Sequence, residues 1–208
     1  MAATESGTYR VFESDRGGEE LLLVEKGHEE PIYVQASGYY EPLQSTVQEL
    51  QAGYLVSATL AWSGEGDPSF AELEIETRTL FAFVDDISDI FEQAKETFEQ
   101  GKREQMPIYS NVTYGTDGQP NGVLYTFAKQ TDEKDIFAEF QTGRMTLEPM
   151  IDKLSEGGED PPYEVFVIRP ESTMFLVVYL TLEKGGLLAD TIRDEYDCPR
   201  PEPVDSNE

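Results

Sequence analysis

The residues best suited to nucleophilic or metal chemistry are scarce in this chain, which has one histidine, His28, and one cysteine, Cys198. His28 lies in the charged, glycine-containing stretch of residues 26–30, which indicates an exposed loop. A serine or cysteine nucleophile usually needs a histidine base held in a pocket, and this histidine has no such setting. The carboxyl of Asp197 beside Cys198 disfavours the reactive thiolate. We therefore expect neither residue to be catalytic.

Carboxylates offer a second route to chemistry, and the densest run contains Asp85, Asp86 and Asp89. This run lacks the alternating ligands and the closing glutamate of a calcium loop, so we interpret Asp85 or Asp86 as the N-terminal cap of a helix. Among 42 acidic residues, a carboxylate pair suitable for hydrolysis arises by chance and carries no signal. Phosphate-binding glycine motifs are missing, and zinc would need more cysteine and histidine. The sequence thus indicates no catalytic residue, no metal ligand and no cofactor.

Tyrosines are the remaining candidates for a functional surface. Tyr39 and Tyr40 follow a glycine and precede Glu-Pro, so we expect them in a loop or at a strand end. Tyr109 and Tyr114 lie beside a turn-rich loop at residues 115–122. Exposed aromatic side chains can anchor a partner protein or stack on bases, although a tyrosine can also cover the core with its hydroxyl in water. We take these four tyrosines as candidate partner-binding residues.

The 208 residues carry a net charge of −27, from 42 acidic against 15 basic residues. In dilute salt this self-repulsion destabilises a compact state, whereas at molar salt the Debye length falls to about 3 Å and neighbouring carboxylates hardly interact. The acidic residues are spread over every segment, which is typical of a protein adapted to a salt-rich cytoplasm. The alternative, a nucleic-acid mimic or a protein that binds a basic partner through its acids, predicts clustered acids.

Length and apolar content indicate a folded protein of one large domain or two small ones. With one cysteine, an intrachain disulfide cannot form, which favours a reducing compartment. The first seven residues have neither the basic nor the apolar stretch of a signal peptide. The longest apolar run, within residues 174–182, is shorter than the roughly 20 residues of a membrane-spanning helix. We therefore expect a soluble, cytoplasmic protein without a membrane partner.

Period-two alternation of apolar side chains dominates the first 85 residues. Apolar residues alternate at residues 54–62 and again at residues 73–83, with glutamates on the other face of the second run. Such alternation is typical of half-buried antiparallel strands. With three shorter strands before them, these runs predict a small barrel, OB-like as one option, or a strongly bent sheet. Residues 87–101 follow with apolar side chains at helical spacing, and Gly101 ends this predicted helix.

The second half of the sequence mixes both kinds of element. Strands are expected at residues 108–114, 123–128, 165–168 and 175–182, with two short helices before the third strand and a last helix at residues 187–196. The strand at 175–182 is apolar on both faces, which favours a central position. The expected fold class is α+β. It has a mainly β, barrel-like unit at residues 1–105 that ends in a helix, an α+β unit at 106–197, and a disordered, acidic, proline-rich tail at 198–208.

Three segments of the sequence, ATLAW at residues 58–62, RTLFAFVDD at 78–86 and DTIRDEYDCPRP at 190–201, form a recognisable set. Together they resemble an uncharacterised conserved family of haloarchaeal proteins of about this length. The resemblance covers nearly the whole chain. It implies adaptation to salt, and it implies no activity, cofactor or site residue.

Three classes of function stay open. The leading hypothesis is a non-catalytic binding or adaptor module with an unknown protein partner, because no catalytic constellation accompanies the β framework and its tyrosines. The first alternative is a nucleic-acid or ribosome-associated factor that uses the barrel, although the net charge opposes lysine and arginine contacts to phosphates in dilute salt. The second alternative is an enzyme of an unrecognised class that uses carboxylates, tyrosine or a bound metal. The sequence favours the binding module and leaves the question of catalysis open.

Overall fold

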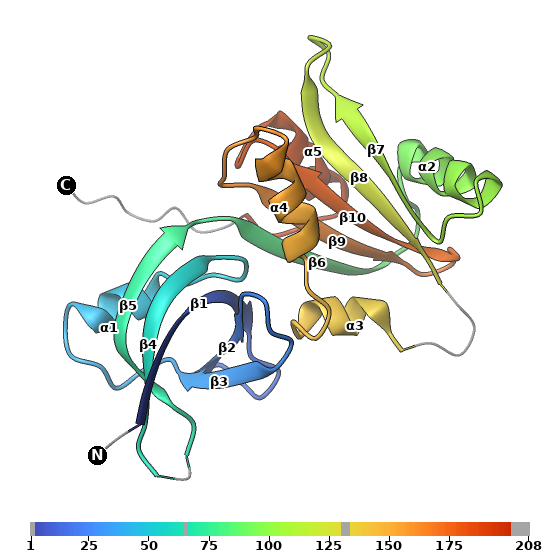
Figure 1. The fold of residues 1–208 in the computed structure, drawn as a ribbon. Helices are drawn as coiled ribbons and strands as arrows, with labels where there is room; N and C mark the ends of the chain where they lie inside the picture. Colours follow the sequence, from blue (N-terminus) through green and yellow to red (C-terminus); the bar gives the residue numbers. More distant parts are fainter. Residues whose placement is uncertain (1–2, 65, 130–133, 201–208) are drawn as a thin grey trace.

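The structure is a computed structural model that describes residues 3–64, 66–129 and 134–200 (Figure 1). Within these residues the strands form two five-stranded sheets. The strands of the first sheet are β1 (Ala3–Glu13), β2 (Glu20–Glu25), β3 (Pro31–Gln35), β4 (Leu55–Trp62) and β5 (Ser69–Thr77). The strands of the second sheet are β6 (Leu80–Ile87), β7 (Ile108–Tyr114), β8 (Pro120–Ala128), β9 (Glu164–Pro170) and β10 (Phe175–Thr181). The helices are α1 (Leu43–Gln48), α2 (Glu92–Arg103), α3 (Ile136–Gln141), α4 (Glu148–Glu156) and α5 (Leu187–Glu195).

The first sheet is antiparallel throughout, in the order β3-β2-β1-β4-β5. Its strands bury one face because apolar side chains recur at every second residue, as at Val56, Ala58 and Leu60 of β4. Val47 of α1 and Leu50 pack against that face and complete its hydrophobic cluster. The predicted half-buried antiparallel strands are therefore present in this part of the chain.

Closure of this sheet into a barrel is not confirmed, because the sheet stays open between its edge strands β3 and β5. β3 has only five residues. Among the described residues, the main-chain hydrogen bond between these edges is that from the Gln35 N–H to the Pro68 carbonyl, at 3.3 Å. Glu72, Glu74 and Glu76 are exposed on β5, and charged side chains hinder strand pairing at an edge. The sheet is strongly bent but open, and the α+β class itself is confirmed.

The alternating run at residues 73–83, which looks like one strand in the sequence, is two strands in different sheets. β5 ends at Thr77 and β6 begins at Leu80. Between them, the buried Thr79 hydroxyl accepts a hydrogen bond from the Tyr163 N–H (3.2 Å) and so ties the bend to the second sheet. The chain thus passes from the first sheet to the second between residues 77 and 80. The expected division into units at residues 1–105 and 106–197 stays a prediction.

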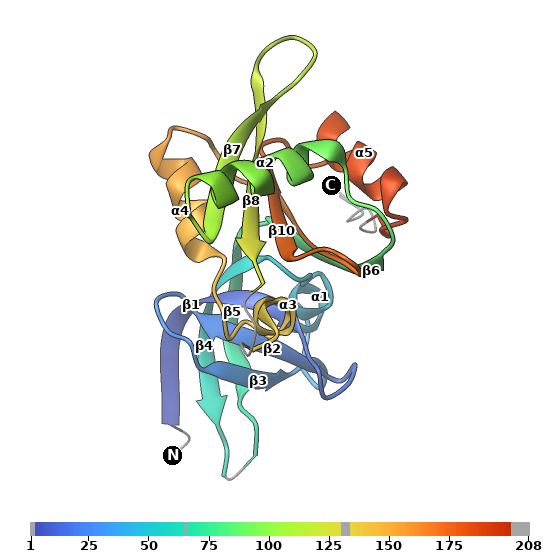
Figure 2. The same ribbon diagram turned by 90° about the vertical axis from the view of Figure 1, so that its right-hand side faces the viewer.

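The second sheet has the order β6-β9-β10-β8-β7, and β6 and β9 form its parallel pair. Every residue of β10 is buried, which confirms the predicted central strand. Helices α3 and α4 pack on one face of this sheet, and α2 and α5 pack on the other (Figures 1 and 2). No helix in the described part of the chain is both long and apolar enough to cross a membrane.

The helix predicted to start at Asp85 or Asp86 starts later than expected. Both residues belong to β6, and the residue that precedes the first turn of α2 is Phe91. The Asp85 carboxylate instead accepts a hydrogen bond from Arg169 of the neighbouring strand β9. The spacing of residues along the chain does not reveal this contact. The final helix, predicted at residues 187–196, matches α5.

One hydrophobic cluster spans the two sheets. Phe12, Leu22 and Val24 of the first sheet pack in the same cluster as Phe81 of β6 and Leu147. The rest of this cluster comes from α3, α4 and the face of the second sheet that they cover. The first sheet is thus fixed against the edge of the second sheet, where β6 lies. Residues 201–208, most of the expected disordered tail, lie outside the described residues.

Candidate functional site

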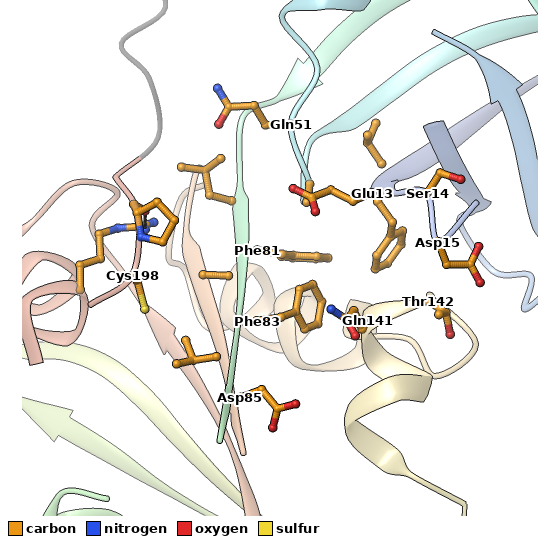
Figure 3. A pocket seen from close by; sticks show the side chains of 18 of the residues that line it. Glu13, Ser14, Asp15, Gln51, Phe81, Phe83, Asp85, Gln141, Thr142 and Cys198 are labelled. Atoms are coloured by element: carbon orange, nitrogen blue, oxygen red, sulfur yellow. Dashed lines mark hydrogen bonds between the residues drawn. The ribbon is translucent and has the colours of Figure 1, made fainter. Parts of the chain in front are cut away.

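A groove of about 690 Å³ runs along the outer edge of β6, where the first sheet meets the second (Figure 3). Its walls are formed by the end of β1, the segment before β4, the end of α3 and the segment after α5. We call it the β6 groove. β6 is an edge strand of its sheet, so one side of its main chain pairs with β9 and the other side faces the groove.

The directions of the main-chain groups in β6 follow from two hydrogen bonds. The Leu80 N–H donates to the Tyr163 carbonyl on the β9 side (3.0 Å), and the next N–H, that of Phe81, donates to the Ala52 carbonyl on the groove side (2.9 Å). Because successive residues of a strand alternate in direction, the N–H groups of Phe83 and Asp85 also face the groove. No described segment pairs with this part of the edge. The groove therefore offers unpaired main-chain donors and acceptors in an extended arrangement.

The side chains around this edge give the groove an apolar floor and a polar rim. Phe81 and Phe83 point to the same side of β6 (Figure 3). The ring of Phe81 packs on Phe12 with centroids 5.7 Å apart, and the ring of Phe83 packs edge-on against Phe137 at 6.1 Å. Beside these rings, the polar rim consists of Glu13, Ser14, Asp15, Gln141 and Thr142 (Figure 3). An extended chain in the groove would meet aromatic rings beneath it and carboxylates beside it.

Arg169 of β9 fixes the end of the groove at Asp85. Its Nε lies 2.6 Å from Asp85 Oδ1, its Nη2 bonds Asp85 Oδ2, and its Nη1 lies 2.5 Å from Asp135 Oδ2. The guanidinium also lies over the Phe137 ring, at 4.5 Å from the centroid. The hydrogen bond from Arg169 holds the pKa of the Asp85 carboxyl below its ordinary value. Asp85 is thus an anchored carboxylate.

A buried ion pair fixes the opposite wall. Arg193 Nη2 lies 2.5 Å from Glu164 Oε2, and both side chains are almost fully buried. Arg193 Nη1 also donates to the Pro199 carbonyl (2.5 Å), which holds the segment after α5 against the groove. Cys198 of that segment is half-buried, and burial raises the pKa of its thiol. The wall is rigidly supported and its sulfur is a protonated thiol at neutral pH.

Comparison with known proteins places the whole described fold in one family. Residues 1–201 match the “Family of unknown function (DUF6663)”. The chain belongs to this family. The expected membership of an uncharacterised conserved family is confirmed, whereas a haloarchaeal origin stays an expectation. The search of curated proteins and the search of solved structures found no match.

The four candidate tyrosines of this DUF6663 member do not line the β6 groove, and they fall into two separate pairs. Tyr39 is half-buried, donates its hydroxyl proton to the Gln35 carbonyl (2.6 Å) and accepts from the Phe70 N–H (3.1 Å). Tyr40 next to it is 94% exposed. The first of this pair holds β3 near β5, and only the second is free to contact a partner.

The other pair lies on β7, the opposite edge strand of the second sheet. The Tyr109 hydroxyl donates to Glu104 Oε1 (3.0 Å), and the base of its side chain lies so close to Gly101 that an added Cβ there would stand 2.6 Å from the Tyr109 Cβ. Tyr114 is 62% exposed near the end of the strand. As in the first pair, one tyrosine is held by intrachain contacts and the other is exposed.

The described residues contain no group of three or more histidine, cysteine, aspartate or glutamate side chains placed to hold a metal ion. His28 is exposed, as expected, and its Nδ1 lies 3.0 Å from Glu25 Oε2. Sequence reasoning missed the β6 groove. The stretch at residues 79–84 is uncharged, but longer uncharged stretches occur elsewhere, as at residues 50–64. An uncharged stretch does not reveal that β6 is an edge strand, because an edge is defined by distant segments.

Proposed function

We propose that this protein is a non-catalytic binding module that holds an extended segment of a partner protein along the free edge of β6. The observation that carries the proposal is that the N–H groups of Phe83 and Asp85 face a groove large enough for a peptide. An extended chain added to a sheet edge gains main-chain hydrogen bonds, and pockets for alternate side chains supply specificity. The β6 groove supports the proposal because unpaired main-chain donors lie beside the aromatic rings of Phe81 and Phe83.

The chemistry of the groove also defines the segment that fits it. Alternate side chains of the bound segment face Phe81 and Phe83, so they are apolar. Glu13 and Asp15 are exposed at the rim, where they favour a lysine or arginine beside the apolar residues. In molar salt this attraction acts only over about 3 Å, so the ion pair forms by direct contact.

Peptide selection with the purified protein tests this proposal. A random peptide library is selected in 2 M KCl, and the amide hydrogen exchange of Phe83 is then measured with and without a selected peptide. We expect apolar peptides with a basic residue, and we expect exchange at the Phe83 N–H to slow by about tenfold or more on binding.

Matched variants locate the site. Gln141 and Gln48 are the exposed last residues of the six-residue helices α3 and α1, and of the two only Gln141 lines the groove. Gln141→Trp fills the groove and abolishes peptide binding, whereas Gln48→Trp leaves it unchanged. Equal binding to both variants, or unchanged exchange at Phe83, would overturn the proposal.

The exposed tyrosines extend the proposed interaction surface. Tyr40 and Tyr114 are free to contact a protein partner, and Tyr39 and Tyr109 hold the backbone beside them. The nucleic-acid alternative uses the same exposed rings for base stacking. RNA binding that is lost in both Tyr40→Ala and Tyr114→Ala would favour that alternative. The enzyme alternative has no comparable observation in its support. All three proposals place the protein in a salt-rich cytoplasm.

A further inference from the structure

A second groove, of about 760 Å³, lies between α2 and the neighbouring ends of β8 and β10. We call it the α2 groove. Its floor is aromatic, because the rings of Phe98 and Phe175 stack with centroids 4.5 Å apart and planes inclined by 20°. Two methionines border it and stay open to solvent, since Met106 is 50% and Met174 is 66% exposed. The groove has the size and the apolar lining of a small-molecule site.

The charge of this groove is opposite to that of the molecule. The chain has a net charge of −27 and only seven lysines, and three of them, Lys95, Lys102 and Lys129, line the α2 groove. Glu99 is the carboxylate that lines it within the described residues. By contrast, the described residues that line the β6 groove include four carboxylates and two arginines. Lysines concentrated around an apolar floor favour a ligand that is anionic and apolar at once.

Intrachain contacts hold the three ammonium groups without neutralising all of them. Lys95 is paired with Asp89 at 2.9 Å, and the Nζ of Lys102 lies 3.7 Å from Glu99 Oε1. Lys129 Nζ donates to the carbonyls of Thr173 (3.0 Å) and Pro170 (3.4 Å). An ammonium has three donors, so within the described residues these two neutral acceptors leave one donor of Lys129 without a partner, and burial lowers the pKa of the group.

We propose that the α2 groove is a binding site for a small organic anion with an apolar body, such as an alkyl carboxylate. The apolar body lies on Phe98 and Phe175 between the two methionines, whose flexible side chains adapt to its shape. The carboxylate accepts a hydrogen bond from the free donor of Lys129. This site is separate from the β6 groove and does not depend on a peptide ligand there.

Methionine methyl signals report binding in the α2 groove, because Met106 and Met174 line it. With five methionines in the chain, the spectrum contains few signals. The full-length protein is labelled with ¹³C-methyl methionine and titrated with octanoate in 2 M KCl. We expect the Met106 and Met174 signals to shift, with Met145, which is exposed elsewhere, and the buried Met150 unchanged. Absence of a shift at Met106 and Met174 overturns the proposal, and so does an equal shift at Met145.

Control ligands and variants test separately the contact with the anionic group and the contact with the apolar body of the ligand. Octyltrimethylammonium has the same alkyl chain with the opposite charge, and we expect it to bind about tenfold or more weakly than octanoate. Lys129→Gln and Lys102→Gln weaken octanoate binding, whereas Lys153→Gln on α4 does not. Met174→Glu abolishes binding, and Leu187→Glu, at a residue that is 80% exposed on α5, leaves it intact. Equal affinity for both ligands, or equal affinity in all the lysine variants, contradicts the proposed anion site.

Discussion

Arg10 of β1 and Glu148 at the start of α4 form a two-point ion pair across the junction between the first sheet and the helices of the second. Arg10 Nε lies 2.6 Å from Glu148 Oε1, and Arg10 Nη2 lies 2.9 Å from Oε2. The side chains are 5% and 12% exposed. The remaining guanidinium nitrogen donates to the Gly53 carbonyl at 2.7 Å. Each of the three guanidinium nitrogens thus donates to an acceptor, an arrangement that the single ammonium nitrogen of a lysine could not reproduce.

Removing one partner of this pair is expected to be costly. Glu148→Leu leaves the buried Arg10 charge without its carboxylate, which destabilises the fold by about 3–5 kcal/mol. In the double variant Arg10→Met, Glu148→Leu, the loss is smaller, because no buried charge is left unpaired. Urea unfolding in 2 M KCl measures the free energy of unfolding of each variant. Additive losses in the double variant would show that the two residues act independently.

Gly53 is expected to tolerate no side chain. Its φ is +99°, and an added Cβ would lie 2.5 Å from the Phe81 N at the start of β6. Gly53→Ala should therefore destabilise the fold by more than about 1 kcal/mol. Gly27 is the matched control, since its φ is +90° and no heavy atom lies within 4 Å of its added Cβ. Thermal unfolding compares the loss of stability in Gly53→Ala with that in Gly27→Ala, and the loss should be larger in Gly53→Ala. Similar losses would mean that backbone strain alone, without the close approach to β6, accounts for the destabilisation.

Salt is expected to stabilise the protein strongly. Screening weakens the repulsion within a chain of net charge −27, so the melting temperature should rise by about 10 °C or more between 0.1 M and 2 M KCl. Changing Glu72, Glu74 and Glu76 of β5 to lysine adds two charge units each and brings the net charge from −27 to −21. That variant should gain less from salt when both proteins are followed by circular dichroism. An equal gain would show that the effect is not one of screened repulsion.

The alkaline limit of stability is expected to depend on Tyr196. Burial raises the pKa of its phenol from 10.0 to about 12, although the hydroxyl accepts a hydrogen bond from the Phe91 N–H (3.1 Å). Between these two values the unfolded chain has lost this proton and the folded chain has kept it, so stability falls as the pH rises through that range. Below pH 10 this group contributes no slope.

The variant Tyr196→Phe isolates that titration, because every other tyrosine stays the same. The free energy of unfolding of the wild type relative to the variant should be constant from pH 8 to about 10. It should then fall as the pH rises to about 12. Urea midpoints measured along this pH series give the difference. A constant difference over the whole series would show that Tyr196 does not ionise differently in the folded state.

Local patterns in the sequence predict the elements of this fold better than their pairing. The apolar run in β10 indicates a strand buried on both faces, and the spacing of Leu188 and Ile192 indicates α5. The break between β5 and β6 leaves no trace, because the alternation continues in phase through Arg78 and Thr79. The open first sheet and the exposed side of β6 depend on which strands meet, and no short window of residues contains that information.

The candidate site divides in the same way. The number of tyrosines in the sequence favours exposed rings. Tyr40 and Tyr114 are indeed exposed, whereas Tyr39 and Tyr109 are held by hydrogen bonds from their hydroxyls. The main-chain donors of Phe83 and Asp85 have no sequence signature at all, since every residue except proline carries an N–H. A site made of backbone groups is found only when the strand order is known.

The hydrogen bond from the Phe81 N–H to the Ala52 carbonyl determines where an added strand can begin. The first donor left for a guest segment is the N–H of Phe83, so the segment cannot slide toward Leu80. In the proposed strand addition this stop would limit the positions open to the guest, and a shift of one residue would turn its side chains to the opposite face. On this proposal, Ala52 would contribute to selectivity without touching any side chain of the guest segment.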